Sequence, residues 1–266
     1  MLNNKIKIII VILLIVIGGV FYFSKKENKP KKIETAIPEE IIISEDTVDA
    51  EIDIEENIEN KTRLRQEDTE EEKIPDKVLL DVSFTSQAPF AKWDELHEEA
   101  CEEASIVMVK YFLGKKDLSI QIAEKEIQDL VEFQIKKYGD YKDSNAEQTA
   151  RLYAEFYSQP KDGVKMEVVY DFKKDDLKKY LSKGYPIIVP VAGRLLGNPN
   201  FTPPGPLYHN LVLVGYEGDN IITNDPGTRK GDGYKYNIDV LYKAIHDFTG
   251  KKENIEKGGK AMIVLE

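Results

Sequence analysis

The stretch EEACEEASIVMVKYF, from Glu98 to Phe112, holds the only cysteine of the 266-residue chain. After Cys101 the apolar residues recur at helical spacing and Gly114 follows the last of them, so the stretch predicts a buried helix that begins near the thiol. The positive end of a helix dipole favours thiolate over thiol, and thiolate is the form that a cysteine nucleophile uses. A buried free cysteine is also a common small core residue, so the stretch alone leaves both interpretations open.

Residues 1–28 predict a transmembrane signal anchor. Ile8 to Phe23 is an uncharged apolar run with lysines on both sides. With its flanks the run reaches the lower limit of about 17 residues for a spanning helix. No small-residue cleavage site follows it. Under the positive-inside rule, the five lysines after the run would place the following domain in the cytoplasm. A short N-terminal tail before a single apolar segment usually exports the domain instead, and we give this second argument more weight. We therefore expect a single-pass membrane protein whose domain is extracytoplasmic.

Residues 29–77 predict an acidic, disordered stalk. They contain no aromatic residue and no sustained amphipathic period. A segment of this composition cannot bury enough apolar surface to fold, and its like charges keep it extended. The stalk accounts for much of the net charge of −11, so the acidity of the chain does not indicate a basic partner.

Residues 78–266 have a suitable length for one domain with its own core. Beyond the cysteine helix, the first half predicts a helix from Ser119 to Lys137, and a third helix capped by Ser144 with Glu147 as its capping-box partner. The second half predicts strands over 164–169, 185–191, 209–216, 220–223, 234–236 and 261–265, with helices over 171–184 and 239–246; a further strand is expected over 78–84. Helices followed by a mostly antiparallel sheet predict the α+β class.

The strand that begins at His209 and the strand that ends before Asp225 are joined by a short turn at residues 217–219. In such a hairpin the start of the first strand lies beside the end of the second, so His209 should neighbour Asp225 or Asn224. A cysteine hydrolase needs an imidazole that takes the thiol proton and a carboxylate or amide that orients it. A strand-end histidine with a local hydrogen bond, and an ordinary Asp-Pro-Gly turn, are the alternatives.

Four motifs occur in a set order along the chain: Gln87 in FTSQAPF, Cys101 in ACEEAS, His209 at the start of HNLVLVGY, and Asn-Asp-Pro with Asp225 at its centre. The order resembles that of the bacteriocin-processing (double-glycine) peptidases and their stand-alone relatives in the papain-like clan. The resemblance covers about residues 80–266. It implies a papain-like fold, in which the nucleophile helix packs on the sheet. It also implies Cys101 as nucleophile, His209 as general base, Asp225 as orienting residue and Gln87 as an oxyanion donor beside the Cys101 N–H.

One departure from the family pattern concerns the nucleophile. Many relatives have Cys-Gly-Pro, whereas Glu102 and Glu103 follow Cys101 here. Two carboxylates beside a thiolate raise its pKa unless they point away or pair with lysines. As first-turn residues they also stabilise the helix, which is the interpretation we prefer. The chain shows no transporter domain, so the resemblance does not carry over a substrate.

Two further histidines are alternative candidates. His97 lies four residues before Cys101 and would approach the thiol on a continuous helix, but no carboxylate in a neighbouring strand is placed to orient it. His246 lies on an expected polar helix and is predicted to be at the surface. No pair of histidines has the spacing of metal ligands, and the sequence contains neither a phosphate-binding glycine loop nor a basic patch among aromatics. We expect no metal, no cofactor and no nucleic acid.

The sequence thus predicts a membrane-anchored, monomeric cysteine hydrolase, most simply a peptidase with a Cys-His-Asp triad that acts on a peptide or protein substrate. The loop from Gly193 to Pro206, rich in proline and glycine, is expected to border the substrate cleft. Phe90 and Trp93 are expected to line the cleft or to cap the core. Two alternatives stay open: an amidase of the same fold that cuts cell-wall peptides, and an inactive binding module, suggested by the acidic residues beside Cys101.

Overall fold

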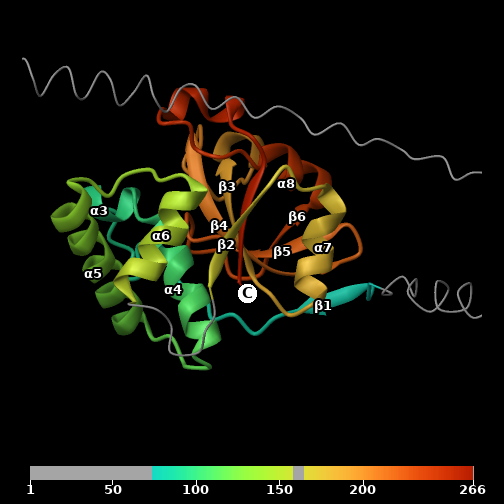
Figure 1. Ribbon diagram of the computed structural model, residues 1–266, viewed down its shortest axis with the longest axis horizontal. Helices are drawn as coiled ribbons and strands as arrows, with labels where there is room; N and C mark the ends of the chain where they lie inside the picture. The colour runs from blue at the N-terminus through green and yellow to red at the C-terminus, as the bar shows by residue number, and fades with distance from the viewer. Residues whose placement is uncertain (1–73, 158–164, 266) are drawn as a thin grey trace, which may run out of the picture. The chain divides into compact units, whose positions relative to one another are not determined.

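The computed structural model describes residues 74–157 and 165–265, which belong to one compact unit (Figure 1). The expected anchor over 1–28 and almost all of the expected stalk over 29–77 lie outside the described residues and stay predictions. Within the part of the chain that the structure describes, no helix is long and apolar enough to cross a bilayer. Pro75 and Asp76, which precede the expected domain start, already bond to the sheet domain through their carbonyl oxygens.

An antiparallel sheet of seven strands forms the centre of the described unit (Figure 1). Its strands follow the order β2-β7-β3-β4-β5-β6, and β1 pairs with β4 outside that path. Their bounds are β1 Lys77–Leu79, β2 Met166–Tyr170, β3 Ile187–Ala192, β4 Tyr208–Glu217, β5 Asn220–Asn224, β6 Tyr234–Asn237 and β7 Ala261–Leu265. Every pairing is antiparallel, so the predicted α+β class is confirmed.

Helices cover both faces of this sheet. The first-half helices α3 (Glu95–Glu98), α4 (Cys101–Leu113), α5 (Ile120–Tyr138) and α6 (Ala146–Phe156) form one layer, and α7 (Lys174–Ser182) and α8 (Ile238–Ala244) form the other (Figure 1). Short 3₁₀ helices run over Gly193–Leu196 and Lys252–Lys257. Successive side chains of a strand point to opposite faces. Ile188 and Val212 accordingly join the core under α4, whereas Ile187 and Leu211 join the core under α7 and α8.

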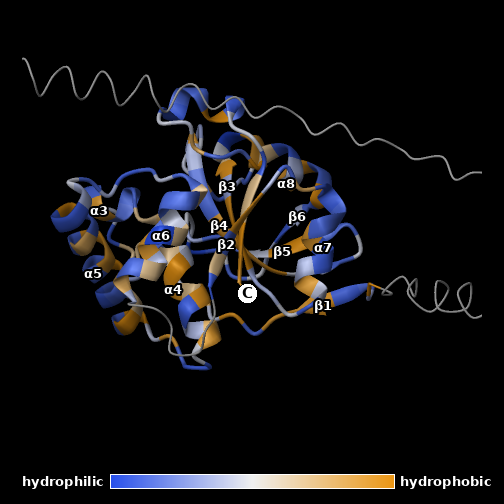
Figure 2. Ribbon diagram, in the orientation of Figure 1, coloured by the Kyte–Doolittle hydropathy of each residue, from blue (hydrophilic) through white to orange (hydrophobic). Residues whose placement is uncertain are grey.

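Covering both faces explains why the central strands are apolar throughout instead of alternating with polar residues. All six residues of β3 and nine of the ten residues of β4 are buried. Figure 2 shows these strands as the hydrophobic centre of the domain, with hydrophilic segments on the outer helices. The helix α4 packs directly on β4, and its residues from Cys101 to Val109 are all buried. The predicted packing of the cysteine helix on the sheet is confirmed.

The helix ends agree with their sequence signals at two of three places. Gly114 follows α4 as predicted, and Ser119 caps α5 through its side chain. The cap of α6 was predicted at Ser144 but is Asn145, whose side chain bonds the Gln148 N–H while Gln148 bonds back. Both neighbouring residues are good caps. Tertiary packing decides between them, because Ser144 donates to Glu102 instead.

Other boundaries differ by a few residues. β1 ends at Leu79, short of the expected residue 84, because the paired register with β4 stops at this residue. α7 begins at Lys174, three residues after the expected start, where the Asp176 side chain accepts from the Lys173 N–H. α8 ends at Ala244, so His246 lies beyond the helix on which it was predicted.

Candidate active site

Cys101 and His209 line one cleft of about 330 Å³ between the first helical layer and the sheet. Cys101 is the first residue of α4, and His209 is the second residue of β4, opposite Val191 of β3. The other residues that line the cleft are Gln87, Trp93, Glu98, Glu99, Asp143, Phe201, Thr202, Pro206, Leu207, Tyr208, Gly227 and Lys252. The loop from Gly193 to Pro206 therefore borders the cleft as predicted, as does Trp93.

His209 and Asp225 are in direct contact, as the hairpin predicted. The β4–β5 pairing ends at Val212 opposite Asn224, and beyond it the His209 Nε2 lies 2.7 Å from the Asp225 Oδ1. Both side chains are buried. The second ring nitrogen of His209, Nδ1, has no hydrogen-bond partner among the described residues. Asn224, the alternative orienting residue, instead donates to the Val82 carbonyl and accepts from the Gly233 N–H.

The Asp225 carboxylate is fully hydrogen-bonded. Its Oδ1 also accepts from the Gly227 N–H at 3.0 Å, and its Oδ2 accepts from the Tyr236 hydroxyl at 2.6 Å and from the Asn198 amide at 3.2 Å. Burial alone favours the neutral acid, but the charge and hydrogen bond of His209, helped by Tyr236 and the Gly227 N–H, hold the Asp225 pKa below its usual range. Asp225 is therefore a carboxylate that holds the imidazole of His209 in place.

Several of these supporting residues escaped the sequence reasoning. Asn198 lies in the loop that was expected to border the cleft, but nothing in that loop singled it out. Tyr236 is one of the two tyrosines of β6, and only the contact in the structure identifies it as the one whose hydroxyl reaches Asp225. Phe201 packs edge-to-face on the His209 ring, with centroids 5.5 Å apart. Gly227 lies against the same ring, since a Cβ there would be 2.8 Å from the His209 Cε1.

The Cys101 thiol donates a hydrogen bond to the Glu102 Oε2 at 3.0 Å and accepts one from the Asn210 backbone N–H. Only 6% of Cys101 is exposed. Burial raises the thiol pKa well above its usual range. The charge and hydrogen bond of Glu102, followed by the charge of Glu103, raise the pKa further, whereas the Asn210 N–H lowers it. The free cleft therefore favours the thiol, although the helix dipole alone predicts the thiolate.

Glu102 and Glu103 are buried and form no ion pair with a lysine of the described segments, so neither is only a solvated first-turn residue. The Glu102 Oε1 accepts from the Ser144 N–H at 2.8 Å and from its hydroxyl. Glu103 accepts from the Gln134 amide, and its Oε2 is buried with no partner. Burial and the charge of Glu102 raise the Glu103 pKa well above its usual range. Glu103 is therefore a neutral acid when Glu102 is charged.

Gln87 lies at the cleft, but its amide nitrogen is already engaged. It donates to the carbonyl oxygens of His97 at 2.8 Å and Glu98 at 3.2 Å, while its Oε1 is buried without a partner. The backbone N–H of Cys101 has no acceptor among the described residues and lies at the N-terminus of α4. An oxyanion formed at Cys101 thus meets one free donor, and Gln87 becomes a second donor only when one of its two bonds is released.

The other histidines are held away from the thiol. The His97 Nδ1 lies 2.6 Å from Asp94, and its Nε2 lies 3.1 Å from Glu124. The continuous helix that would bring His97 to the thiol does not form, because α3 ends at Glu98 and α4 starts at Cys101. His246 is half-buried and its Nδ1 bonds the Gly258 carbonyl, so the prediction of a surface residue was wrong. Within residues 74–157 and 165–265, no group of His, Cys, Asp and Glu is arranged to hold a metal ion.

The comparison with protein families agrees with the predicted resemblance. The model of the Peptidase_C39 like family matches residues 79–254, well over half of the chain. Among solved structures, a Bacillus anthracis protein assigned to the C39-like peptidases matches at 15% identity and a TM-score of 0.46, covering 71% of this chain and 98% of that chain. None of the curated proteins matches. The cysteine helix packed on an antiparallel sheet is the papain-like α+β fold, and the chain belongs to the Peptidase_C39 like family.

Proposed function

We propose that this protein is a cysteine peptidase in which Cys101 is the nucleophile, His209 the general base and Asp225 the residue that orients the base. One observation carries the proposal. The Asp225 carboxylate binds His209 through Nε2, which leaves Nδ1 without a partner in the same cleft that Cys101 lines. An imidazole oriented on one nitrogen and free on the other is what proton transfer from a thiol requires.

The proposed reaction starts from the thiol. His209 Nδ1 takes the Cys101 proton, which otherwise bonds Glu102, and Asp225 stabilises the imidazolium that results. The thiolate attacks the peptide carbonyl, and the Cys101 N–H binds the developing oxyanion. The imidazolium then gives its proton to the leaving amine as the C–N bond breaks. A water molecule, deprotonated by the same imidazole, attacks the thioester and releases the acid product, which restores the thiol.

A second candidate function, an inactive binding module, has a specific observation in its favour. The Cys101 thiol bonds the Glu102 carboxylate, and its surroundings raise its pKa well above the usual range. A thiol in that state is a weak nucleophile unless the base removes its proton when substrate binds. The two candidates therefore differ in whether His209 acts on the thiol at all.

Cleavage of a randomised library of quenched fluorogenic peptides by the full chain tests the proposal. We expect cleavage by the wild type and a loss of about 10⁶-fold in Cys101→Ala and in His209→Ala, because each removes the nucleophile or the base of a triad whose members act as a unit. Cleavage that persists in Cys101→Ala contradicts the proposal. If the wild type cleaves nothing and its single cysteine resists an active-site-directed peptidyl electrophile, the binding module is the better account.

We further propose that residues 1–28 anchor a monomeric protein in a membrane with the peptidase domain on the extracytoplasmic side. The support is the apolar run from Ile8 to Phe23 and the lack of a cleavage site after it. Protease added outside intact cells should remove the domain while leaving a cytoplasmic marker whole. A domain that stays protected until the cells are lysed contradicts the orientation, and recovery of the full chain without detergent contradicts the anchor.

A further inference from the structure

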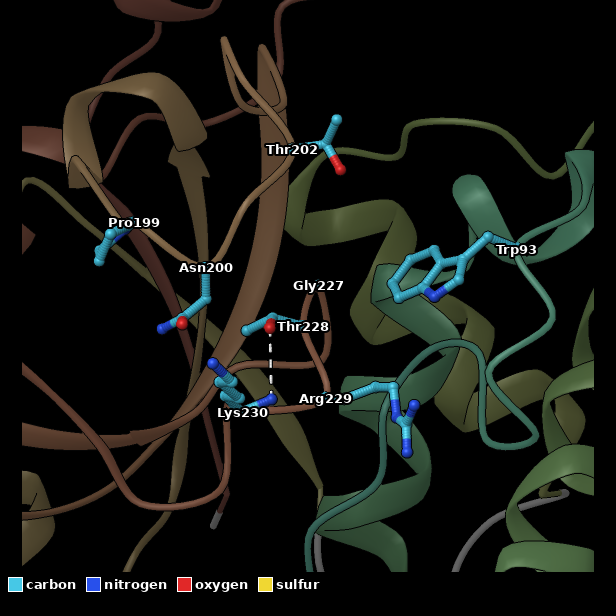
Figure 3. A pocket seen from close by; sticks show the side chains of 8 residues that line it. All are labelled: Trp93, Pro199, Asn200, Thr202, Gly227, Thr228, Arg229 and Lys230. Carbon is cyan, nitrogen blue, oxygen red and sulfur yellow. Dashed lines mark hydrogen bonds between the residues drawn. The ribbon is translucent and has the colours of Figure 1, made fainter.

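A second hollow of about 670 Å³ lies beside the catalytic cleft. Figure 3 shows Trp93 on one side of it, Asn200 and Thr202 on the other, and Arg229 and Lys230 on the loop after β5. Trp93, Thr202 and Gly227 line both this hollow and the cleft that holds Cys101 and His209. The two spaces therefore adjoin each other at these residues.

The hollow carries positive charge that no ion pair among the described residues neutralises. Its remaining lining residues, Pro199 and Thr228 among them, are all uncharged. Neither the Arg229 guanidinium nor the Lys230 ammonium has a hydrogen bond or an ion pair to any described residue. The other two arginines of the described chain both have partners: Arg194 donates to the Gly205 carbonyl, and Arg151 lies over the Tyr138 ring.

The loop that carries the two cations is tied to the proposed triad. The Asp225 Oδ1 accepts from the Gly227 N–H, and the Asp225 backbone N–H donates to the Gly231 carbonyl, so one end of the loop is fixed on the orienting carboxylate and the other on the backbone of the same residue. Within the loop the Thr228 hydroxyl oxygen accepts from the Lys230 N–H at 3.2 Å (Figure 3). The position of Arg229 relative to the scissile bond is therefore set by the backbone and not only by a freely moving side chain.

The catalytic cleft itself has the opposite charge. It is lined by the carboxylates of Glu98, Glu99 and Asp143 and by one ammonium, Lys252, which lies 2.6 Å from Glu99 and 3.1 Å from Asp143. Three carboxylates and one ammonium leave this side with an excess of negative charge. An acidic substrate group is repelled on that side and attracted on the side of the second hollow, so the charge distribution orients a substrate along the site.

We propose that the hollow lined by Arg229 and Lys230 is a subsite for a carboxylate of the substrate, and that the enzyme prefers peptides with an acidic group on that side of the scissile bond. The inference rests on the proposed peptidase function and adds the substrate class. A guanidinium binds a carboxylate through two parallel hydrogen bonds, and the Lys230 ammonium, which extends to the other side of the loop in Figure 3, adds to the positive charge of the hollow. The carboxylate comes from an Asp or Glu side chain or from a free C-terminus.

A positional series of quenched fluorogenic peptides tests the subsite on the full chain. The series consists of peptide pairs: one member carries a single Glu at one position of an otherwise random peptide, and the other carries Gln at the same position. Each pair is made with a free and with an amidated C-terminus. We expect kcat/KM to favour Glu over Gln about fivefold at one position, because one charge-assisted contact at an exposed site contributes on that scale. A preference for the free over the amidated terminus identifies the terminal carboxylate as the source instead.

Matched variants connect the preference to the two cations. The double change Arg229→Gln with Lys230→Gln should reduce the preference to less than about twofold, and high salt should weaken it in the wild type. Lys136→Gln removes an exposed charge on α5, far along the chain from this loop, and should leave the preference unchanged. A preference that is absent, or that survives in the double variant, overturns the subsite.

The subsite and the proposed function fail in different ways. Binding of the same peptides to Cys101→Ala, measured by the mass of the retained peptides, reports the subsite without any cleavage. Retention of Glu peptides over Gln peptides that disappears in the double variant supports the subsite even if no peptide is ever cleaved. Cleavage with no charge preference in either measurement supports the peptidase and rejects the subsite.

Discussion

On the sheet side of the cleft the buried Asp225 carboxylate accepts four hydrogen bonds and faces an imidazole, whereas on the helix side two buried carboxyl groups crowd one thiol. Asp225 receives donors from His209, Gly227, Tyr236 and Asn198. The carboxyl groups of the helix side, on Glu102 and Glu103, have no cationic partner, and one oxygen of Glu103 has no hydrogen bond among the described residues. We call these two sides the sheet wall and the helix wall.

The difference separates the two requirements of a cysteine peptidase. The sheet wall orients the proposed base before any substrate arrives, because every acceptor of its carboxylate is already occupied. The helix wall keeps the proposed nucleophile protonated, because burial and two neighbouring carboxyl groups raise its pKa. In the proposed mechanism, the deprotonation of Cys101, and not the orientation of His209, is therefore the step that a bound substrate has to promote.

The largest expected effect comes from neutralising the sheet wall. Asp225→Asn removes the charge that stabilises the His209 imidazolium and favours the wrong tautomer, so kcat/KM for a cleaved peptide should fall by about 10³- to 10⁴-fold. Asp232→Asn makes the same change at an exposed position of the same loop and should be nearly silent. Circular dichroism checks that both variants are folded. Equal activity of the two variants contradicts the role given to Asp225.

A smaller effect is expected from moving the base without changing its partners. In Gly227→Ala the new Cβ would lie 2.8 Å from the His209 Cε1 and 2.9 Å from its Nε2, so the imidazole has to shift. A displacement of this kind costs about 10²-fold in kcat/KM. Gly259→Ala is the control, since the nearest atom to its Cβ is 4.0 Å away. Unchanged kinetics in Gly227→Ala show that the sheet wall does not need this close contact.

The smallest expected effect concerns stability and comes from the helix wall. Burial raises the Glu103 pKa, so the folded protein holds a proton that the unfolded chain releases above its ordinary carboxyl pKa. The stability that Glu103 contributes is fully present below the pKa of the unfolded carboxyl group, and it is lost as the pH rises through the folded-state pKa. Glu103→Gln, which mimics the neutral acid, should therefore raise the free energy of unfolding by about 1 to 3 kcal/mol at neutral pH.

Urea unfolding at several pH values measures this effect. The advantage of Glu103→Gln should disappear below the pH at which an unfolded carboxyl group is protonated, because the wild type then folds without taking up a proton. Glu167→Gln changes an exposed carboxylate on β2 and should show no such trend. If the stability advantage of Glu103→Gln over the wild type grows as the pH falls, the raised pKa of Glu103 is contradicted.

Most of the fold follows from signals that are local in the sequence. β7 has the bounds that were predicted, Gly114 follows α4, and the short turn between β4 and β5 brings His209 to Asp225. Periodicity, caps and turns act over a few residues, and the sequence records them directly. The same locality explains the error at Ser144, because two adjacent capping residues are equivalent until a distant side chain, Glu102, engages one of them.

What the sequence could not supply are the contacts between elements that are far apart along the chain. Tyr236 and Asn198 reach Asp225 only after β6 and the loop after β3 come together. Glu102 and Glu103 have the pattern of any acidic first turn, and their burial depends on packing against Ser144 and Gln134 from two other segments. The electrostatic contrast between the two walls is therefore a property of the tertiary structure.

The central claim is that Cys101 is a nucleophile held as a thiol by Glu102 until His209 takes its proton. The pH dependence of iodoacetamide alkylation tests it most directly, because Cys101 is the only cysteine in the chain and the intact mass reports it alone. For the wild type we predict a half-maximal rate above the free-thiol pKa of about 8.5, a clear shift to lower pH in Glu102→Gln, and a shift to higher pH in His209→Ala. Three superimposable profiles near that of a free thiol would show that neither wall acts on Cys101 and would contradict the account.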